Sequence, residues 1–116
     1  MSRLLPVLLD AAFVVVFAAI GRRSHEHGLS AVGVIQTAGP FLCGAAAGWL
    51  LASTLTSLAP TGLPFGLVVV VATVVIGMLL RLAIGAGTAW SFVTVATAVL
   101  TVMLLGWRLL ARLVGD

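Results

Sequence analysis

One acidic residue lies where a membrane-spanning helix should carry no charge. Asp10 falls inside the apolar stretch 4–20. An ionised carboxylate costs several kcal/mol in hydrocarbon, so such a group is retained with a partner, with water or for a function. Two interpretations follow. Asp10 is a proton or ligand site, or it is part of a structural ion pair or is wetted at the membrane interface.

A basic partner for this carboxylate is available near the other end of the chain. Asp10 lies about 9 Å along the helix axis from Leu4, and helical side chains lean toward the N-terminus. Arg108 and Arg112 approach the same membrane face from the last apolar stretch. Arg108 continues a row of small residues, so it points into a bundle if that row does. We therefore predict an Asp10–Arg108 contact.

A second polar group is expected at the opposite face. It combines the first loop with later segments, namely Arg22, Arg23, His25, Glu26, His27, Arg81 and Gln36. Arginine and histidine near the headgroups can bind an anionic lipid or a phosphate, for which Arg22, Arg23, His25 and Arg81 are the candidates. The ordinary interpretation is an interfacial anchor. Two histidines without further Cys or His ligands are not expected to hold a metal.

The composition places these residues in a membrane protein. The chain has 116 residues, of which 62% are hydrophobic and 8% charged, whereas soluble domains carry about 25% charged residues. Four apolar spans, 4–20, 30–55, 63–84 and 88–114, are separated by short breaks. The prediction is a single domain of class all-α, an integral membrane four-helix up-down bundle with both termini on one side.

The charges do not orient this bundle. All six basic residues are arginine, three on each side, so the positive-inside rule leaves both orientations open, including insertion both ways as an antiparallel pair. The arginines form no long basic stripe, so nucleic acid is not an expected partner. The expected location is the bacterial cytoplasmic membrane, with several spans.

Rows of small residues suggest how the helices pack. On the last span, steps of four and three join residues that are small or carry hydroxyl groups, followed by two arginines: Gly87, Ser91, Thr94, Ala98, Thr101, Leu105, Arg108 and Arg112. Such a row favours close helix packing, or it forms a polar path with Thr94 and Thr101 along a cavity. On the second span, Gly44 and Gly48 form Gly-x-x-x-Gly, and Pro40 should bend the helix near Gln36.

Several segments together resemble a known family. They are Gly-Arg-Arg-Ser-His-Glu-His-Gly at 21–28, Gln-Thr-Ala-Gly-Pro-Phe-Leu-Cys-Gly at 36–44, Arg81, Trp-Ser-Phe-Val-Thr-Val-Ala at 90–96 and Gly-Trp-Arg at 106–108. The chain resembles the small actinobacterial membrane proteins of domain of unknown function 3054. This resemblance implies a four-helix integral membrane protein and implies no activity.

Two functions stay open. The first is an oligomeric small-solute or proton-coupled transporter or channel, in which Asp10 titrates and Arg108, Thr94, Thr101 and Gln36 complete a binding or proton site. The second is a non-catalytic accessory or assembly subunit of a larger membrane complex. The sequence contains no recognisable catalytic set, so we expect no enzyme and no cofactor. Beside the lipid bilayer, the expected partner is a second copy of the chain or another membrane protein.

Overall fold

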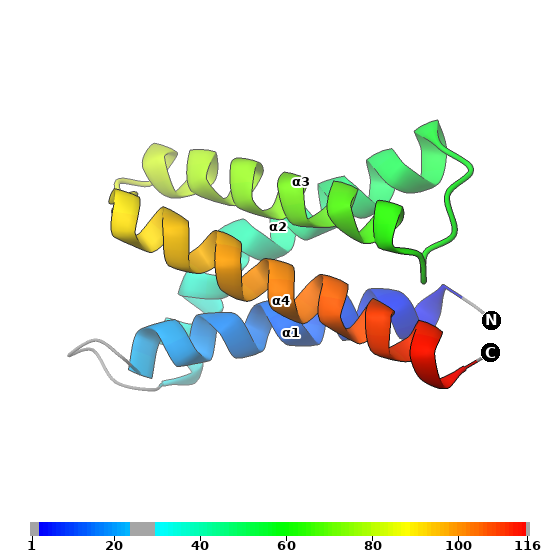
Figure 1. Ribbon diagram of the computed structural model, residues 1–116. Coiled ribbons are helices and arrows are strands. Elements are labelled where there is room, and N and C mark those ends of the chain that lie inside the picture. Colours follow the sequence, from blue (N-terminus) through cyan, green and yellow to red (C-terminus); the bar gives the residue numbers. More distant parts are fainter. Residues whose placement is uncertain (1–2, 24–29, 116) are drawn as a thin grey trace.

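The described part of the chain folds into four helices that run up and down. A computed structural model describes residues 3–23 and 30–115, except for the side chains of residues 22 and 23. The helices are α1 (Leu4–Arg23), α2 (Ala31–Leu55), α3 (Leu63–Ala83) and α4 (Trp90–Val114). Both ends of the chain lie at one end of the bundle (Figure 1). The predicted class, an all-α helical bundle, is confirmed.

Local signals explain the ends of the helices. The Ser30 hydroxyl accepts a 3.0 Å bond from the Gly33 amide and caps α2, so this helix begins one residue later than expected. The first helix continues past Ile20 to Arg23. The last helix begins at Trp90 instead of residue 88. The preceding α3 ends in a turn in which Gly85 adopts a positive φ of 79°.

Glycines bring α2 and α3 into close contact. A Cβ atom on Gly44 would lie 2.8 Å from the Ala72 carbonyl oxygen, and one on Gly48 would lie 3.0 Å from Val69 Cα. Both positions therefore have to be glycine for the two backbones to approach this closely. The Gly-x-x-x-Gly of the second span is a packing motif within the chain.

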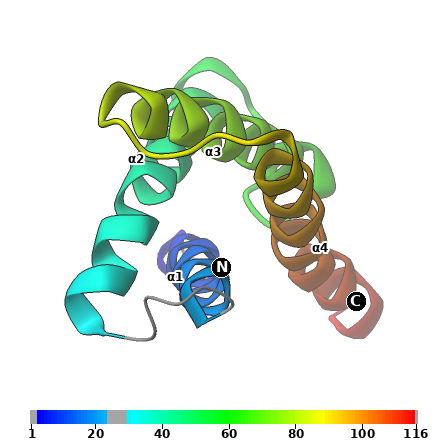
Figure 2. The ribbon, with the colours of Figure 1, turned by 90° about the vertical axis from the view of Figure 1, so that its left-hand side faces the viewer.

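The helices form a ring that is least tightly closed between α1 and α4. Each helix contacts the next one along the chain, and α1 returns to α4. Figure 2 shows that the first part of α2 runs away from α3 and that α2 bends along its length. Pro40 lies within this helix and removes one backbone hydrogen bond, which is an ordinary cause of such a bend.

The small-residue row predicted on α4 does not point into the bundle. Its members Ser91, Thr94 and Ala98 are exposed, and Thr101 is half-buried. The buried residues of α4 are instead spaced by four: Ala96, Leu100, Leu104 and Arg108. Residues spaced by four are offset by roughly +40° around the helix at each step. Residues at alternating steps of four and three are offset by only about −20° every seven residues. The two rows therefore meet at Arg108 and diverge toward the start of the helix.

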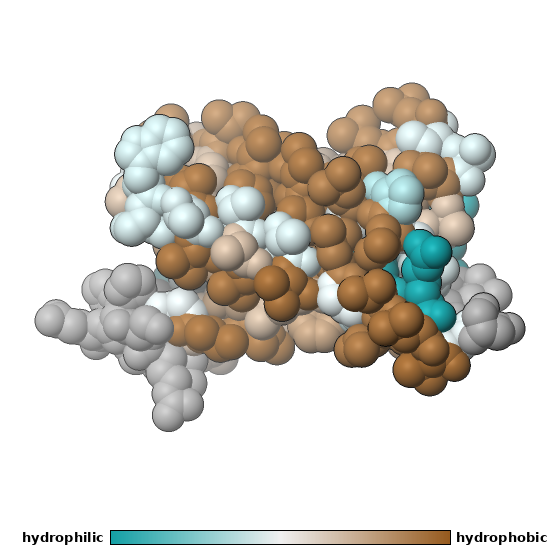
Figure 3. Space-filling model, viewed as in Figure 1, coloured by the Kyte–Doolittle hydropathy of each residue, from teal (hydrophilic) through white to brown (hydrophobic). Residues whose placement is uncertain are grey.

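The outer surface of the bundle suits lipid. All four helices are long and apolar enough to cross a membrane, and large apolar side chains such as Leu50, Leu79 and Val102 are at least 60% exposed. Hydrophobic residues cover most of the face in Figure 3, and its most hydrophilic described residues lie toward the end that holds the termini. An apolar exterior of this extent is that of a multi-pass membrane protein.

Candidate functional site

The carboxylate of Asp10 is buried and accepts four hydrogen bonds. Asp10 is 1% exposed. Its Oδ1 accepts from Trp107 Nε1 at 2.8 Å and from Arg108 Nη1 at 2.9 Å. Its Oδ2 accepts from Trp49 Nε1 at 2.8 Å and from Arg108 Nη2 at 2.7 Å. The predicted Asp10–Arg108 contact is thus present as a bidentate ion pair, the strongest geometry available to these two groups.

The Arg108 side chain is fully buried and also donates to two backbone carbonyls, one in the turn before α3 and one on its own helix. Its Nε donates to the Pro60 carbonyl at 2.9 Å, and Nη1 donates to the Leu104 carbonyl at 3.0 Å. A Cβ on Gly66 would lie 2.7 Å from the Cδ of this arginine, so the arginine stem crosses α3 where a side chain is missing. The guanidinium also lies 4.5 Å from the centre of the Trp107 ring.

This arrangement leaves the carboxylate little capacity for chemistry. A carboxylate has about four positions at which it accepts hydrogen bonds, and all four are occupied by donors from α2 and α4. A proton or a solute could bind Asp10 only by breaking one of these bonds. The geometry favours the structural interpretation, in which the ion pair joins α1 to α4.

Sequence reasoning missed the two tryptophans that complete this cluster. Trp49 and Trp107 lie near the ends of their spans, where a tryptophan is ordinarily an interfacial anchor, as Trp90, which is 84% exposed, is here. Trp49 is 8% exposed instead, and its ring packs edge-on against Phe65 with 4.6 Å between ring centres. The position of Trp107 next to Arg108 was the available signal, because an indole N–H needs a partner when it is buried.

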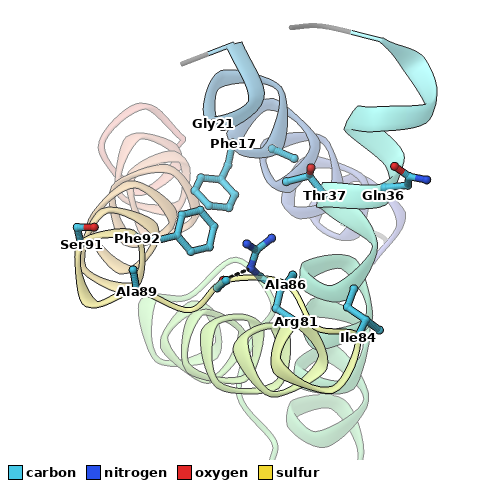
Figure 4. Close-up of a pocket in the computed structure, with 12 residues that line it drawn as sticks. Phe17, Gly21, Gln36, Thr37, Arg81, Ile84, Ala86, Ala89, Ser91 and Phe92 are labelled. Atoms are coloured by element: carbon cyan, nitrogen blue, oxygen red, sulfur yellow. Dashed lines mark hydrogen bonds between the residues drawn. The ribbon is translucent and has the colours of Figure 1, made fainter. Parts of the chain in front are cut away.

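A second group of polar residues surrounds a cavity at the other end of the bundle. The cavity has a volume of about 710 Å³ and is lined by all four helices and the α3–α4 turn. From Gly66 to Arg81, α3 rises about 22 Å, so the cavity is far from the ion pair. Arg81 and Gln36, both expected at this face, line it together with Thr37, Ser91 and Phe92. Figure 4 shows Thr37 turned toward the cavity and Gln36 turned away from Arg81.

Arg81 is held from one side only. Its Nε donates to the Gly87 carbonyl at 2.9 Å, across the turn between α3 and α4. Its guanidinium carbon lies 4.5 Å from the centre of the Phe92 ring. These two contacts fix the plane of the guanidinium and direct its outer edge toward the middle of the cavity (Figure 4).

The remaining candidates are not brought together with either group. The Thr94 hydroxyl donates to the Trp90 carbonyl of its own helix at 2.9 Å, on the outside of the bundle. Thr101 belongs to neither the cavity lining nor the ion-pair cluster. The side chains of Arg22 and Arg23, and all of His25, lie outside the described residues.

The fold and the cluster define a class of protein: a multi-pass helical membrane bundle closed by a buried ion pair. The chain belongs to the family described as Protein of unknown function (DUF3054), whose model matches residues 7–111. The resemblance found in the sequence is thereby confirmed. The match includes Asp10, Trp49, Arg81 and Arg108. No curated protein and no solved structure matches the chain.

Proposed function

We propose that the chain is a carrier of a small solute and that the cavity around Arg81 is its solute site. The observation that carries the proposal is the cavity itself. Its volume of about 710 Å³ lies within the range of small-molecule sites, about 300–1,000 Å³. The lining combines apolar walls with a few polar groups, as such sites do. Sites of this kind also occur between the helices of bundles.

A layer of phenylalanines separates the cavity from the ion-pair end. Phe17, Phe41 and Phe92 come from three different helices, with ring centres 5.3 to 6.3 Å apart. Phe41 is fully buried and fits against Gly77, where a Cβ would lie 2.5 Å from its ring. A solute could pass this layer only if the helices rearranged, which favours a carrier over an open channel.

In this proposal Asp10 joins α1 to α4 through Arg108 and takes no part in transport. It holds α1 against α4 at one end of the bundle, and the cavity lies between the helices at the other end. Because four short spans leave little room for an internal path, we expect the carrier to act as a homo-oligomer. We place it in the bacterial cytoplasmic membrane on the basis of its helical spans and family resemblance, which also suggests an actinobacterial source.

The test measures from which side of the membrane water reaches the cavity. Cys43, the cysteine of the chain, is exposed on the outer surface of the bundle and is first replaced by serine. Thr37→Cys then places a thiol in the cavity, and Thr97→Cys serves as the control. The Thr97 hydroxyl donates to the Val93 carbonyl on the exposed side of α4, outside the cavity. A membrane-impermeant maleimide is applied to intact cells and to inside-out vesicles.

A compartment-specific reporter on the C-terminus first establishes that the chain inserts in one orientation. A carrier should then expose position 37 to each side in turn, so both preparations should label Thr37→Cys and neither should label Thr97→Cys. Labelling of Thr37→Cys from one side only would refute the carrier. That result, together with retention of the chain on a larger membrane complex in mild detergent, would instead identify an accessory subunit.

A further inference from the structure

The charge of Arg81 has no counter-ion in the part of the chain that the structure describes. Neither terminal nitrogen of its guanidinium is hydrogen-bonded to a described residue, and only Nε is, through Gly87. The carboxylate of Asp10 is bound to Arg108 and lies at the opposite end of the bundle. Arg108, by contrast, is a buried arginine whose three guanidinium nitrogens all donate to acceptors.

An arginine in this position attracts an anion. Arg81 lies in the last turn of a helix that is long and apolar enough to span the membrane. Charged side chains within membrane segments face the interior and pair with other groups, because the cost of an unpaired charge is high there. The outer edge of the guanidinium presents two parallel N–H groups to the cavity, which match the two oxygens of a carboxylate.

The walls around this edge select the rest of the solute. Phe17 and Phe92 lie on one side of the cavity and Ile84 on another, so the space beside the charge is largely apolar (Figure 4). Thr37 adds one hydroxyl group that faces the same space. A dianion such as phosphate would be only half neutralised by one arginine and would leave these walls unused. A singly charged acid with an apolar body would use both.

We propose that the cavity binds an organic monocarboxylate, with its carboxylate bidentate on Arg81 and its apolar body against Phe17 and Phe92. This inference rests on the proposed function, because it takes the same cavity as the solute site. The carboxylate could come from a small soluble acid or from a free fatty acid of the bilayer. The chemistry at Arg81 is the same for both, and the experiment distinguishes them.

The experiment measures equilibrium binding to the purified full chain in nanodiscs of phosphatidylcholine. The probes are radiolabelled benzoate, palmitate and inorganic phosphate, each tested alone. Arg81→Gln removes the charge, and Arg81→Lys keeps the charge but loses the bidentate geometry. Arg112→Gln is the matched control, because Arg112 is an exposed arginine in the last turn of α4. Size-exclusion profiles establish that each variant is folded.

Saturable benzoate or palmitate binding is expected, weakened roughly tenfold to a hundredfold by Arg81→Gln and less by Arg81→Lys. Arg112→Gln should bind as the wild type does. A preference for benzoate indicates a soluble acid, and a preference for palmitate indicates a bilayer acid. Phosphate binding in place of carboxylate, no binding by the folded wild type, or unchanged binding by folded Arg81→Gln and Arg81→Lys would overturn the proposal. Binding needs no passage across the membrane, so this result is independent of the two-sided labelling of Thr37→Cys.

Discussion

Replacing Asp10 by asparagine tests whether the ion pair holds the bundle together. The amide keeps one acceptor oxygen, and its nitrogen accepts no hydrogen bond. In either orientation, that nitrogen meets one indole N–H and one N–H of Arg108, so two of the four bonds are lost. The buried guanidinium also loses its counter-ion. Removing one partner of a buried ion pair costs about 3–5 kcal/mol, and we expect Asp10→Asn to lower the free energy of unfolding by this amount.

The assay is reversible unfolding of the purified protein in mixed micelles of a mild detergent and dodecyl sulfate, followed by tryptophan fluorescence. Asp10→Asn, Arg108→Gln and the double variant form a thermodynamic cycle. Asp10→Asn leaves the guanidinium of Arg108 buried without a counter-ion, and Arg108→Gln does the same to the carboxylate of Asp10. The double variant buries neither charge. We therefore expect the double variant to be more stable than the sum of the two losses predicts, with a coupling free energy of about 2 kcal/mol or more.

Two results would refute this reasoning. The first is an Asp10→Asn protein with the stability of the wild type, and the second is a cycle in which the two losses simply add. Wild-type stability of Asp10→Asn, combined with loss of two-sided labelling at position 37, would assign the carboxylate to a titrating role in transport.

The same unfolding assay tests two further features of the cluster. Trp49→Phe keeps the aromatic packing but removes one hydrogen bond to a charged acceptor, so it should lower the free energy of unfolding by about 1.5–3 kcal/mol. Trp90→Phe, at an exposed position, should leave the free energy of unfolding unchanged. Equal effects of the two substitutions would contradict a hydrogen-bonding role for Trp49. Gly66→Ala places a Cβ 2.7 Å from the stem of Arg108 and should cost about 1–3 kcal/mol. Gly106→Ala is its control, since nothing lies within 4 Å of the added atom, and a Gly66→Ala protein as stable as this control would show that the arginine can move aside.

The sequence predicted the four helices and the ion pair for physical reasons that act locally. Apolar length determines the spans, and antiparallel connection places Asp10 and Arg108 at the same face, where opposite charges in a poor solvent pair. A row with heptad spacing on α4 misled the prediction of its buried face. Which side of a helix is buried depends on the angle at which it crosses its neighbours. The buried row through Leu100 and Leu104 follows from that angle, which the sequence of α4 alone does not give.

The cavity could not be predicted from the sequence. It depends on the divergence of the first part of α2 from α3, on the turn that presents the Gly87 carbonyl to Arg81, and on the side chain of Phe92 beneath the guanidinium. None of these features has a signal in a single apolar sequence. Arg81 itself was identified, but as one of several residues near the headgroups. That no carboxylate of the described residues pairs with it became visible only when Asp10 was located at the other end.

The bonds to Asp10 are completed only after the last helix has been made. Its partners lie 39 residues later for Trp49 and 98 residues later for Arg108. During synthesis, the carboxylate therefore enters the membrane with the first helix, gains one donor when the second helix arrives, and gains its counter-ion only with the fourth. Until then, the carboxylate on the first helix has no counter-ion, which distinguishes an incomplete chain from the folded bundle. A protease or chaperone that recognises polar groups in the bilayer would distinguish incomplete chains from complete ones at this residue.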